Sequence, residues 1–230
     1  MEAFVKHRLQ AVKERIRAAE RRFSRHPGSV RVVAVSKRFP AECIQEALEA
    51  GQRHFGESYL QEAVPKMEAL AGKPIQWHFI GRLQANKTRE VARRFQWVHS
   101  LDRLKLAQRL SEQRPPALPP LNVCLQVNVS GEAQKGGVPP EEVPALAEQV
   151  AQLPGLRLRG LMVLPAMAED FEAQRAPFRR LREIRAALEK QGMHLDTLSM
   201  GMSRDLEAAI AEGATLVRVG SAIFGPRPSL

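Results

Sequence analysis

The sequence is poor in cysteine and aromatic residues and lacks any long apolar run. Its 230 residues include two cysteines, Cys43 and Cys124, one tyrosine and 5% aromatic residues. The cysteines lie in separate apolar segments without metal-spaced histidines, which excludes a disulfide framework and a zinc site and predicts two reduced core thiols in a cytoplasmic protein. Because no run of about 18 apolar residues and no apolar signal segment occurs, we expect neither a membrane span nor secretion.

Basic residues outnumber acidic ones, which raises the question of a nucleic-acid partner. The chain has 35 Lys and Arg residues against 25 Asp and Glu residues, a net charge of +10 and a pI of about 10.3. However, acidic residues are interspersed among the basic ones, and a single strand of nucleic acid would find few aromatic rings on which to stack. We therefore predict a basic, solvated surface and no nucleic-acid partner.

Short apolar segments alternate with amphipathic ones along the chain. An amphipathic helix is predicted over residues 4–23, where apolar residues recur at steps of three and four. Eight apolar segments predict buried strands, at 31–35, 54–56, 76–80, 97–100, 122–127, 160–164, 197–200 and 216–219. Seven segments between them predict helices, at 40–50, 59–70, 87–94, 103–113, 140–152, 170–191 and 204–212.

This alternation predicts an α/β fold, a single-domain (β/α)8 TIM barrel over residues 1–230. Strand–helix alternation is typical of parallel sheets, and eight units in about this length suit a closed barrel. An open doubly wound sheet is the alternative. Residues 1–25 would form an extra helix packed on the barrel. The Pro-rich segment 113–121 is predicted to be a surface loop, because the alternation continues across it.

Lys37 follows the first predicted strand, at the end where α/β sheets bind their ligands. A lysine amine in such a place can be desolvated, lose its proton and attack a carbonyl carbon. The alternative is a lysine that extends into water.

Arg218 lies within the eighth predicted strand, which would neighbour the first strand in a closed barrel. Side chains alternate along a strand, so Arg218 would face the barrel interior if Val217 and Val219 pack under the helices. A buried guanidinium requires an acceptor. It therefore either forms a structural ion pair or holds part of a ligand.

The loops after the seventh and eighth predicted strands carry small residues. Gly201 permits a close backbone approach, Ser203 follows it, and Gly220 and Ser221 end the eighth strand. TIM barrels often bind phosphate with these two loops, so this arrangement is suited to an anion. The simpler interpretation is that Ser203 only caps a helix starting near residue 204, and Asp205 would repel a phosphate unless it points away.

The three features converge on one spot of a closed barrel. An amine, an interior cation and an anion-binding pair of loops would together suit a ligand with an aldehyde, an aromatic ring and a phosphate. Pyridoxal 5′-phosphate (PLP) is such a ligand.

The sequence resembles the pyridoxal phosphate homeostasis protein family, also called the YggS or proline synthetase co-transcribed family. The matching segments keep the family's order and are highly specific together: Ala34–Lys37, Phe55–Glu57, Trp77–Gly81 with Leu83, Gln84, Asn86 and Lys87, Arg159–Met162, Leu198–Ser203 with Asp205, and Val217–Ser221 with Ile223–Gly225. The implied fold is the alanine racemase N-terminal barrel, in agreement with the strand count.

The resemblance also implies a cofactor site. The residues that it assigns to PLP are Lys37, Met202, Ser203, Arg218, Gly220 and Ser221. Lys37 would carry the cofactor as an internal aldimine, Arg218 would meet the pyridine nitrogen, and the serine and glycine residues would hold the phosphate. No catalytic or metal-binding residue is assigned. The chain has Ser58 where the family usually has Asn, so a contact of that amide would be lost or bridged by water.

The implied function is storage, buffering or delivery of PLP inside the cell, without efficient catalysis. A cation at the pyridine nitrogen disfavours ring protonation and weakens the ring as an electron sink. Racemases with this barrel use two bases, one of them a tyrosine from a second domain of the partner subunit. The sole tyrosine here, Tyr59, is expected to start a helix, and the chain ends just beyond the last strand. The alternatives are weak racemase-like or undiscovered amino-acid activity with Lys37 as the one base, a barrel aldolase and a nucleic-acid binder.

The implied partners are PLP and PLP-requiring apoenzymes. We expect a cytoplasmic monomer without a membrane partner. His78 shares a face of its strand with Gln76 and Ile80, and either lines the pocket or is a satisfied interior histidine. The polar loop 130–137, with Lys135, is a candidate to close over the site.

Overall fold

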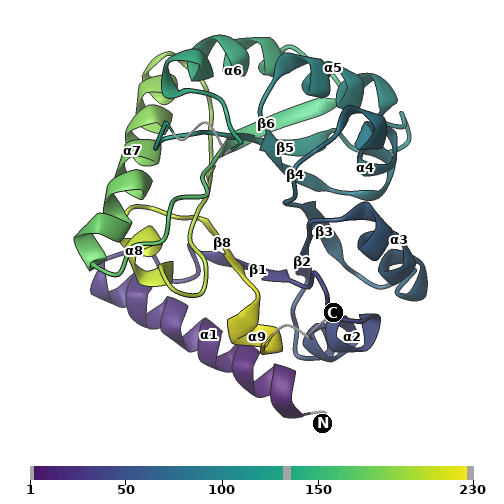
Figure 1. The fold of residues 1–230 in the computed structure, drawn as a ribbon, viewed down its shortest axis with the longest axis vertical. Helices are drawn as coiled ribbons and strands as arrows, with labels where there is room; N and C mark the ends of the chain where they lie inside the picture. The colour runs from purple at the N-terminus through teal and green to yellow at the C-terminus, as the bar shows by residue number, and fades with distance from the viewer. Residues whose placement is uncertain (1–2, 132–135, 227–230) are drawn as a thin grey trace.

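Eight parallel strands close into a barrel in the computed structural model, which describes residues 3–131 and 136–226 (Figure 1). Each strand pairs with its sequence neighbours, and β8 pairs with β1 to complete the ring. The strands are β1 (Arg31–Val35), β2 (His54–Glu57), β3 (Gln76–Phe79), β4 (Trp97–Leu101), β5 (Leu121–Gln126), β6 (Leu156–Met162), β7 (Thr197–Ser199) and β8 (Leu216–Val219). The closed ring confirms the predicted TIM barrel and excludes the open sheet.

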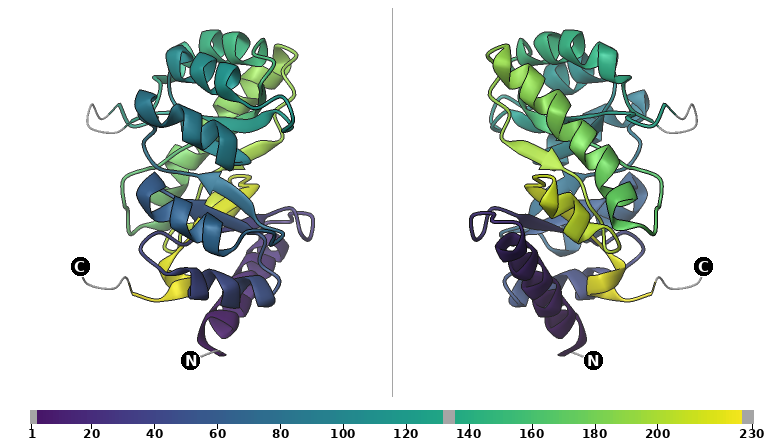
Figure 2. Two further views of the ribbon diagram at one scale, coloured as in Figure 1. Left: turned by 90° about the vertical axis from the view of Figure 1, so that its right-hand side faces the viewer. Right: turned by 90° about the vertical axis from the view of Figure 1, so that its left-hand side faces the viewer.

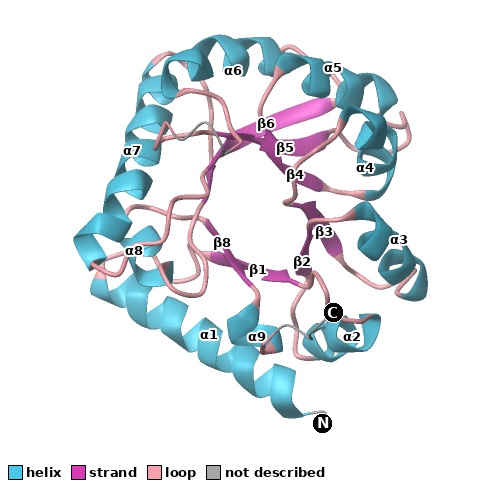
Figure 3. Cartoon of the chain, viewed as in Figure 1, coloured by secondary structure: helices cyan, strands magenta, loops and turns pink. Residues whose placement is uncertain are grey.

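Helices surround the ring on its outside, as the cyan helices around the magenta strands show in Figure 3. Helix α1 (Ala3–Arg22) precedes β1. The helices after the successive strands are α2 (Ala41–Glu49), α3 (Leu60–Ala69), η1 (Ala85–Lys87) with α4 (Thr88–Arg94), α5 (Leu104–Gln113), η2 (Pro140–Glu142) with α6 (Val143–Ala151), α7 (Phe171–Lys190), α8 (Leu206–Ala211) and α9 (Ser221–Phe224).

The strands divide their side chains between two apolar environments, because successive residues point to opposite faces. Side chains that face the helices join one large core, in which Val217 and Val219 of β8 lie. A smaller cluster fills the barrel interior: Val33, Trp97, Cys124, Met162 and Leu216. Arg218 is 3% exposed and hydrogen-bonds inside the barrel, as the alternation along β8 predicts.

Helix α1 packs against α8, α9 and α2, along the outside of the seam between the last and the first barrel units (Figure 1). Its apolar face is buried, as the sequence predicts: Val5, Leu9, Val12, Ile16 and Ala19. A fully buried aliphatic side chain contributes about 1.5–3 kcal/mol, so this face fastens α1 to the barrel. Figure 2 shows the loop from α1 to β1 at one end of the barrel and α9 toward the other.

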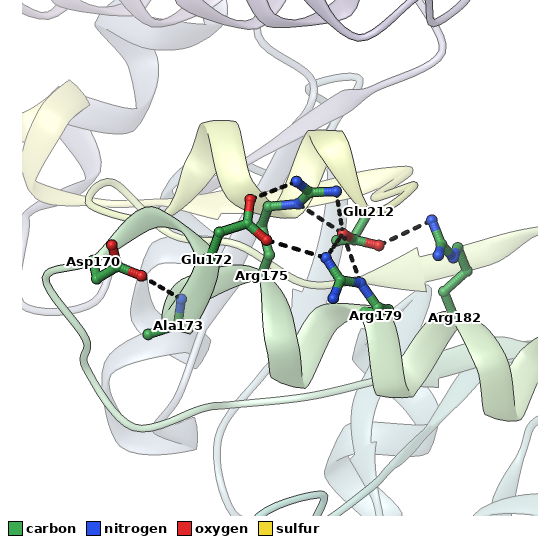
Figure 4. Close-up of polar contacts among 7 residues, drawn as sticks. All are labelled: Asp170, Glu172, Ala173, Arg175, Arg179, Arg182 and Glu212. Atoms are coloured by element: carbon green, nitrogen blue, oxygen red, sulfur yellow. Dashed lines mark hydrogen bonds and ion pairs between the residues drawn. The ribbon is translucent and has the colours of Figure 1, made fainter.

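A buried carboxylate just after α8 fastens this helix to α7 (Figure 4). Glu212 has no exposed side-chain surface and lies 2.7 Å from Arg175, 3.3 Å from Arg179 and 2.9 Å from Arg182. Since a buried charge is costly unless it is paired, these arginines stabilise the buried position of Glu212. The contact fixes the helix that follows the loop after β7.

Some boundaries differ from those predicted from the sequence. Strand β6 begins at Leu156 rather than residue 160, and α8 begins at Leu206 rather than near 204. Helix α9 is not predicted, because its four residues are too few to show a helical period. Cys124 is a buried free thiol as predicted, whereas Cys43 is half-buried.

Two further expectations concern the loops and the membrane. Residues 132–135, including Lys135 of the loop that is a candidate to close over the site, lie outside the described residues. Among the helices of the described chain, none is long and apolar enough to cross a membrane.

Candidate functional site at the carboxyl ends of the strands

A cavity of about 750 Å³ opens at the carboxyl ends of the strands, where TIM barrels bind their ligands. Other parts of its wall come from Ser58, Ile80 and the loop after β6, including Leu164 and Met167. All six residues assigned to PLP from the sequence line it: Lys37, Met202, Ser203, Arg218, Gly220 and Ser221. The structure thus brings them around one space, and their role toward a cofactor stays a prediction.

Lys37 lies in the turn after β1, half-buried in the cavity wall. The next residue, Arg38, has a positive φ of 66°, and its N–H donates to Glu62 Oε2 at 2.7 Å. The preceding residue, Ser36, donates its hydroxyl to Glu57 Oε1 at 2.7 Å. Carboxylates from α3 and β2 therefore hold the turn on both sides of the lysine.

A buried ion pair supports this turn. The side chains of Lys66 and Glu57 are 9% and 0% exposed, and Lys66 Nζ donates to Glu57 Oε1 at 2.8 Å and to the Ser36 carbonyl at 2.9 Å. Burial raises the pKa of Glu57, while Lys66 and Ser36 act in the opposite direction. The pair fixes α3 against the ends of β1 and β2, and with them the position of Lys37.

Arg218 presents its guanidinium to the cavity from the barrel interior. Nη1 donates to Ser199 Oγ at 2.6 Å, and Nη2 donates to the Val163 carbonyl at 2.9 Å. Burial lowers the pKa of Arg218 to about 10, with Asp205 acting in the opposite direction, so the side chain is cationic at neutral pH. None of the described carboxylates lies within ion-pair distance of it, which disfavours a purely structural ion pair.

A chain of neutral histidines extends from Arg218 through the barrel. His99 Nδ1 lies 2.7 Å from Ser199 Oγ, His99 Nε2 lies 2.8 Å from His78 Nδ1, and His78 Nε2 lies 2.9 Å from His54 Nδ1. Burial lowers the pKa of His99 to about 3 and that of His54 to about 4, and it lowers the pKa of His78 well below its ordinary value. His78 is therefore a satisfied interior histidine and does not line the cavity.

One assignment of the hydrogen-bond roles in this chain gives the buried Ser199 hydroxyl an acceptor. A guanidinium can only donate, so Ser199 Oγ accepts from Arg218. In this assignment the Ser199 hydroxyl donates to His99 Nδ1. Each imidazole then donates from Nε2 to the next ring, ending at His54. The chain fixes the orientation of Arg218 without placing a negative charge beside it.

The loop after β7 is a glycine turn closed by a carboxylate. Gly201 has a φ of 95°, and a Cβ there would collide with α8. Asp205 Oδ1 accepts the N–H of Met202 at 2.6 Å, and burial raises the pKa of Asp205. Because Asp205 is the N-cap residue of α8, the interpretation of Ser203 as its cap is wrong. Ser203 instead lies in the cavity wall.

Helix α1 supports the backbone of both anion-suited loops. Arg15 Nη2 donates to the Ser203 carbonyl at 3.2 Å, and Arg8 Nη1 donates to the Ser221 carbonyl at 3.3 Å. Gly220 is the N-cap residue of α9, which begins at Ser221. A short extra helix after β8 is a frequent part of phosphate sites in TIM barrels.

Most of the residues that support the site are not indicated by the patterns described for the sequence. Histidines on three consecutive predicted strands, His54, His78 and His99, are a signal that could have revealed the interior chain. Lys66 and Glu62 carry no such signal, because both resemble ordinary charged residues of an amphipathic helix.

The comparison with protein families places the chain in a fold class. The model of the alanine racemase N-terminal domain matches residues 8–228, so the chain belongs to that family. The chain is 61% identical over 219 residues to the pyridoxal phosphate homeostasis protein of Pseudomonas aeruginosa, covering 95% of this chain and 94% of the relative. It is 49% identical over 226 residues to the Escherichia coli K12 protein of that name, covering 97% of each. The chain is a member of the pyridoxal phosphate homeostasis protein family.

A solved relative extends this likeness to three dimensions. The structure of PipY from Synechococcus elongatus PCC7942 with PLP bound is 38% identical, with a TM-score of 0.84. The likeness covers 96% of this chain and 100% of PipY. The family resemblance stated from the sequence motifs is therefore confirmed.

Proposed function

We propose that the cavity at the carboxyl ends of the strands binds PLP, and that the protein stores, buffers or delivers this cofactor inside the cell. The observation that carries the proposal is the convergence of Lys37, the buried cation Arg218 and the two loops after β7 and β8 on one cavity. The PLP bound to PipY and the name shared by the curated relatives support it.

Each part of the cavity suits one part of the cofactor. PLP supplies an aldehyde, a pyridine nitrogen and a phosphate. Lys37 Nζ is the proposed site of covalent attachment to the aldehyde carbon, with release of water. Arg218 is the proposed neighbour of the pyridine nitrogen, and Ser203, Gly220 and Ser221 are proposed to bind the phosphate, with Met202 close by.

We further propose that the protein is not an efficient amino-acid enzyme. A guanidinium that can only donate disfavours a proton on a pyridine nitrogen beside it, which weakens the ring as an electron sink. Tyr59 is 50% exposed and does not belong to the described lining of the cavity. A cytoplasmic monomer that transfers PLP to apoenzymes fits this role, and the two free thiols agree with a reducing compartment.

The visible spectrum tests the attachment. The purified protein, loaded with PLP and then freed of unbound PLP, is expected to show a visible absorbance band that borohydride removes. Lys37→Ala should lack this band, whereas Lys105→Ala, at an exposed lysine of α5 outside the cavity, should retain it. A band of equal strength in Lys37→Ala and Lys105→Ala contradicts the assignment of Lys37.

Two further measurements test the other parts. Arg218→Ala is expected to retain PLP with an altered spectrum and affinity, and an unchanged spectrum and affinity would count against its assigned role. With PLP present, α-proton exchange on amino acids should be negligible. Rapid exchange that is abolished in Lys37→Ala would show that the protein is an amino-acid enzyme and not only a PLP-binding protein.

A further inference from the structure

A second cavity, of about 520 Å³, lies at the amino-terminal end of the barrel. Its walls come from α1, from the loop between α1 and β1 (dark purple in Figure 2), and from the first residues of β1 and β2. Ile16, Val30 and Val32 supply apolar surface. None of its described lining residues lines the cavity at the carboxyl ends, so the two are separate spaces.

Cationic side chains surround this second cavity: Lys13, Arg17, Arg21, Arg31 and Arg53. In the part of the chain that the structure describes, the side chains of Arg17, Arg21 and Arg31 make no hydrogen bond or ion pair. Burial lowers the pKa of Lys13, and repulsion from Arg17 and Arg53 lowers it further, so these cations act on one another. The fold therefore gathers like charges around one space, and no carboxylate of the described residues forms an ion pair with Arg17, Arg21 or Arg31.

The one acidic residue in the described lining, Glu20, already accepts hydrogen bonds from the loop between α1 and β1. Glu20 is 2% exposed, and its carboxylate accepts the backbone N–H groups of Val30 at 2.9 Å and Gly28 at 3.1 Å. It also accepts the Ser29 hydroxyl at 3.3 Å. Glu20 thus shapes the loop that forms the cavity wall.

A neutral donor completes the lining. His54 uses Nδ1 toward His78, and no described residue is bonded to its Nε2. Its pKa is lowered to about 4, first by burial and then by Arg31, so the ring is neutral at physiological pH. In the assignment of roles given above, its proton resides on Nε2 and can be donated to an anion.

We propose that this cavity is a second binding site, for a small organic anion with a dianionic phosphate-type group and a compact apolar body. Guanidiniums bind phosphate oxygens through paired hydrogen bonds, and Ile16, Val30 and Val32 offer a surface to the apolar body. The volume is in the range of small-molecule sites. The inference stands on this cavity alone and does not rest on the function proposed for the first one.

Phenyl phosphate is a suitable probe, because it has a dianionic head and an apolar ring but no aldehyde. It is titrated by calorimetry at low salt into protein that has been loaded with one equivalent of PLP and freed of unbound PLP, so that the proposed first site is occupied and no excess cofactor competes for the second. Saturable binding to one site is expected. The double variant Arg17→Gln/Arg31→Gln should bind at least tenfold more weakly. The matched control Arg89→Gln/Arg93→Gln changes two exposed arginines of α4 outside both cavities and should bind as the parent does.

The outcomes separate the proposal from its alternatives. Both double variants change exposed side chains, so thermal unfolding should show that they fold. Equal affinity in the two double variants, or no saturable binding to the parent, overturns the site. Inorganic phosphate should bind more weakly than phenyl phosphate, and equal affinity overturns the assignment of an organic ligand. Phenyl phosphate binding that persists in Lys37→Ala shows that the second site stands even if the first cavity fails to bind PLP.

Discussion

Replacing Lys66 by methionine should destabilise the protein by about 3–5 kcal/mol, because the change leaves a buried carboxylate without its partner. Lys66 Nζ makes two hydrogen bonds, to Glu57 Oε1 at 2.8 Å and to the Ser36 carbonyl at 2.9 Å. Hydrogen bonds to charged groups contribute about 1.5–3 kcal/mol each, which reaches a similar total. Methionine retains most of the apolar stem of lysine, so the loss reports on the ammonium group rather than on packing.

Urea unfolding monitored by circular dichroism measures this loss. The midpoint should fall at an unchanged m-value, and Tm should fall by about 10 °C, since a chain of this size loses about 2–4 °C per kcal/mol. Lys73→Met is the matched control, because Lys73 is exposed and its side chain has no hydrogen bond or ion pair with the described residues. It should change stability by no more than about 0.5 kcal/mol.

The pH dependence of the stability cost tests whether the unpaired charge of Glu57 causes it. Burial raises the pKa of Glu57 and Lys66 opposes that rise, so removal of Lys66 raises the Glu57 pKa further. An acid whose pKa is raised on folding favours the folded state at low pH, and this contribution is lost as pH rises through the folded-state pKa. The cost of Lys66→Met should therefore shrink from about pH 8 to about pH 5. A cost below about 1 kcal/mol at neutral pH, or one that does not vary with pH, would refute the reasoning.

Three further predictions concern other parts of the molecule. Arg15→Ala removes the hydrogen bond to the Ser203 carbonyl and should weaken PLP binding about three- to tenfold, with Lys6→Ala, an exposed lysine of the same helix outside both cavities, as the control; equal affinities in a fluorescence titration would contradict a positioning role for Arg15. Glu212→Gln removes the carboxylate shared by three arginines and should cost on the order of 2 kcal/mol in urea unfolding, and a cost near zero would show that this contact does not stabilise the fold. His99 is buried with a pKa lowered to about 3, so the unfolded chain binds more protons below about pH 6.5; this ring alone should lower stability by about 2 kcal/mol from pH 6.5 to pH 5, His54 and His78 should add to the loss, and a flat profile would contradict buried neutral histidines.

Local patterns predict the barrel and five of the six residues around its first cavity, and the family resemblance adds Met202. Alternation along the strand predicts that Arg218, between Val217 and Val219, faces the interior, and it hydrogen-bonds there. The apolar strand before Lys37 predicts that this residue lies at a ligand-binding edge, and it lines the cavity. Both inferences succeed because the two-residue period of a strand is a property of neighbouring residues.

The supporting contacts could not be predicted in this way. Lys66 reaches Glu57 only because α3 folds back across the ends of β1 and β2. The alternative in which Ser203 only caps α8 is wrong because Asp205 is the N-cap residue, a difference of two residues that the apolar pattern does not resolve. The cations of the second cavity come from α1, β1 and β2, which meet only after the barrel closes.

The sequence by itself determined the order of strands and helices, the face to which each strand residue points, and the end of the barrel at which the amine and the small-residue loops gather. Only the tertiary structure decided that His54, His78 and His99 form one hydrogen-bonded chain to Arg218. It alone also decided that five cations share a second cavity. The physical reason is that periodicity follows from backbone geometry over a few residues, whereas strand register and helix docking depend on how the whole core packs at once.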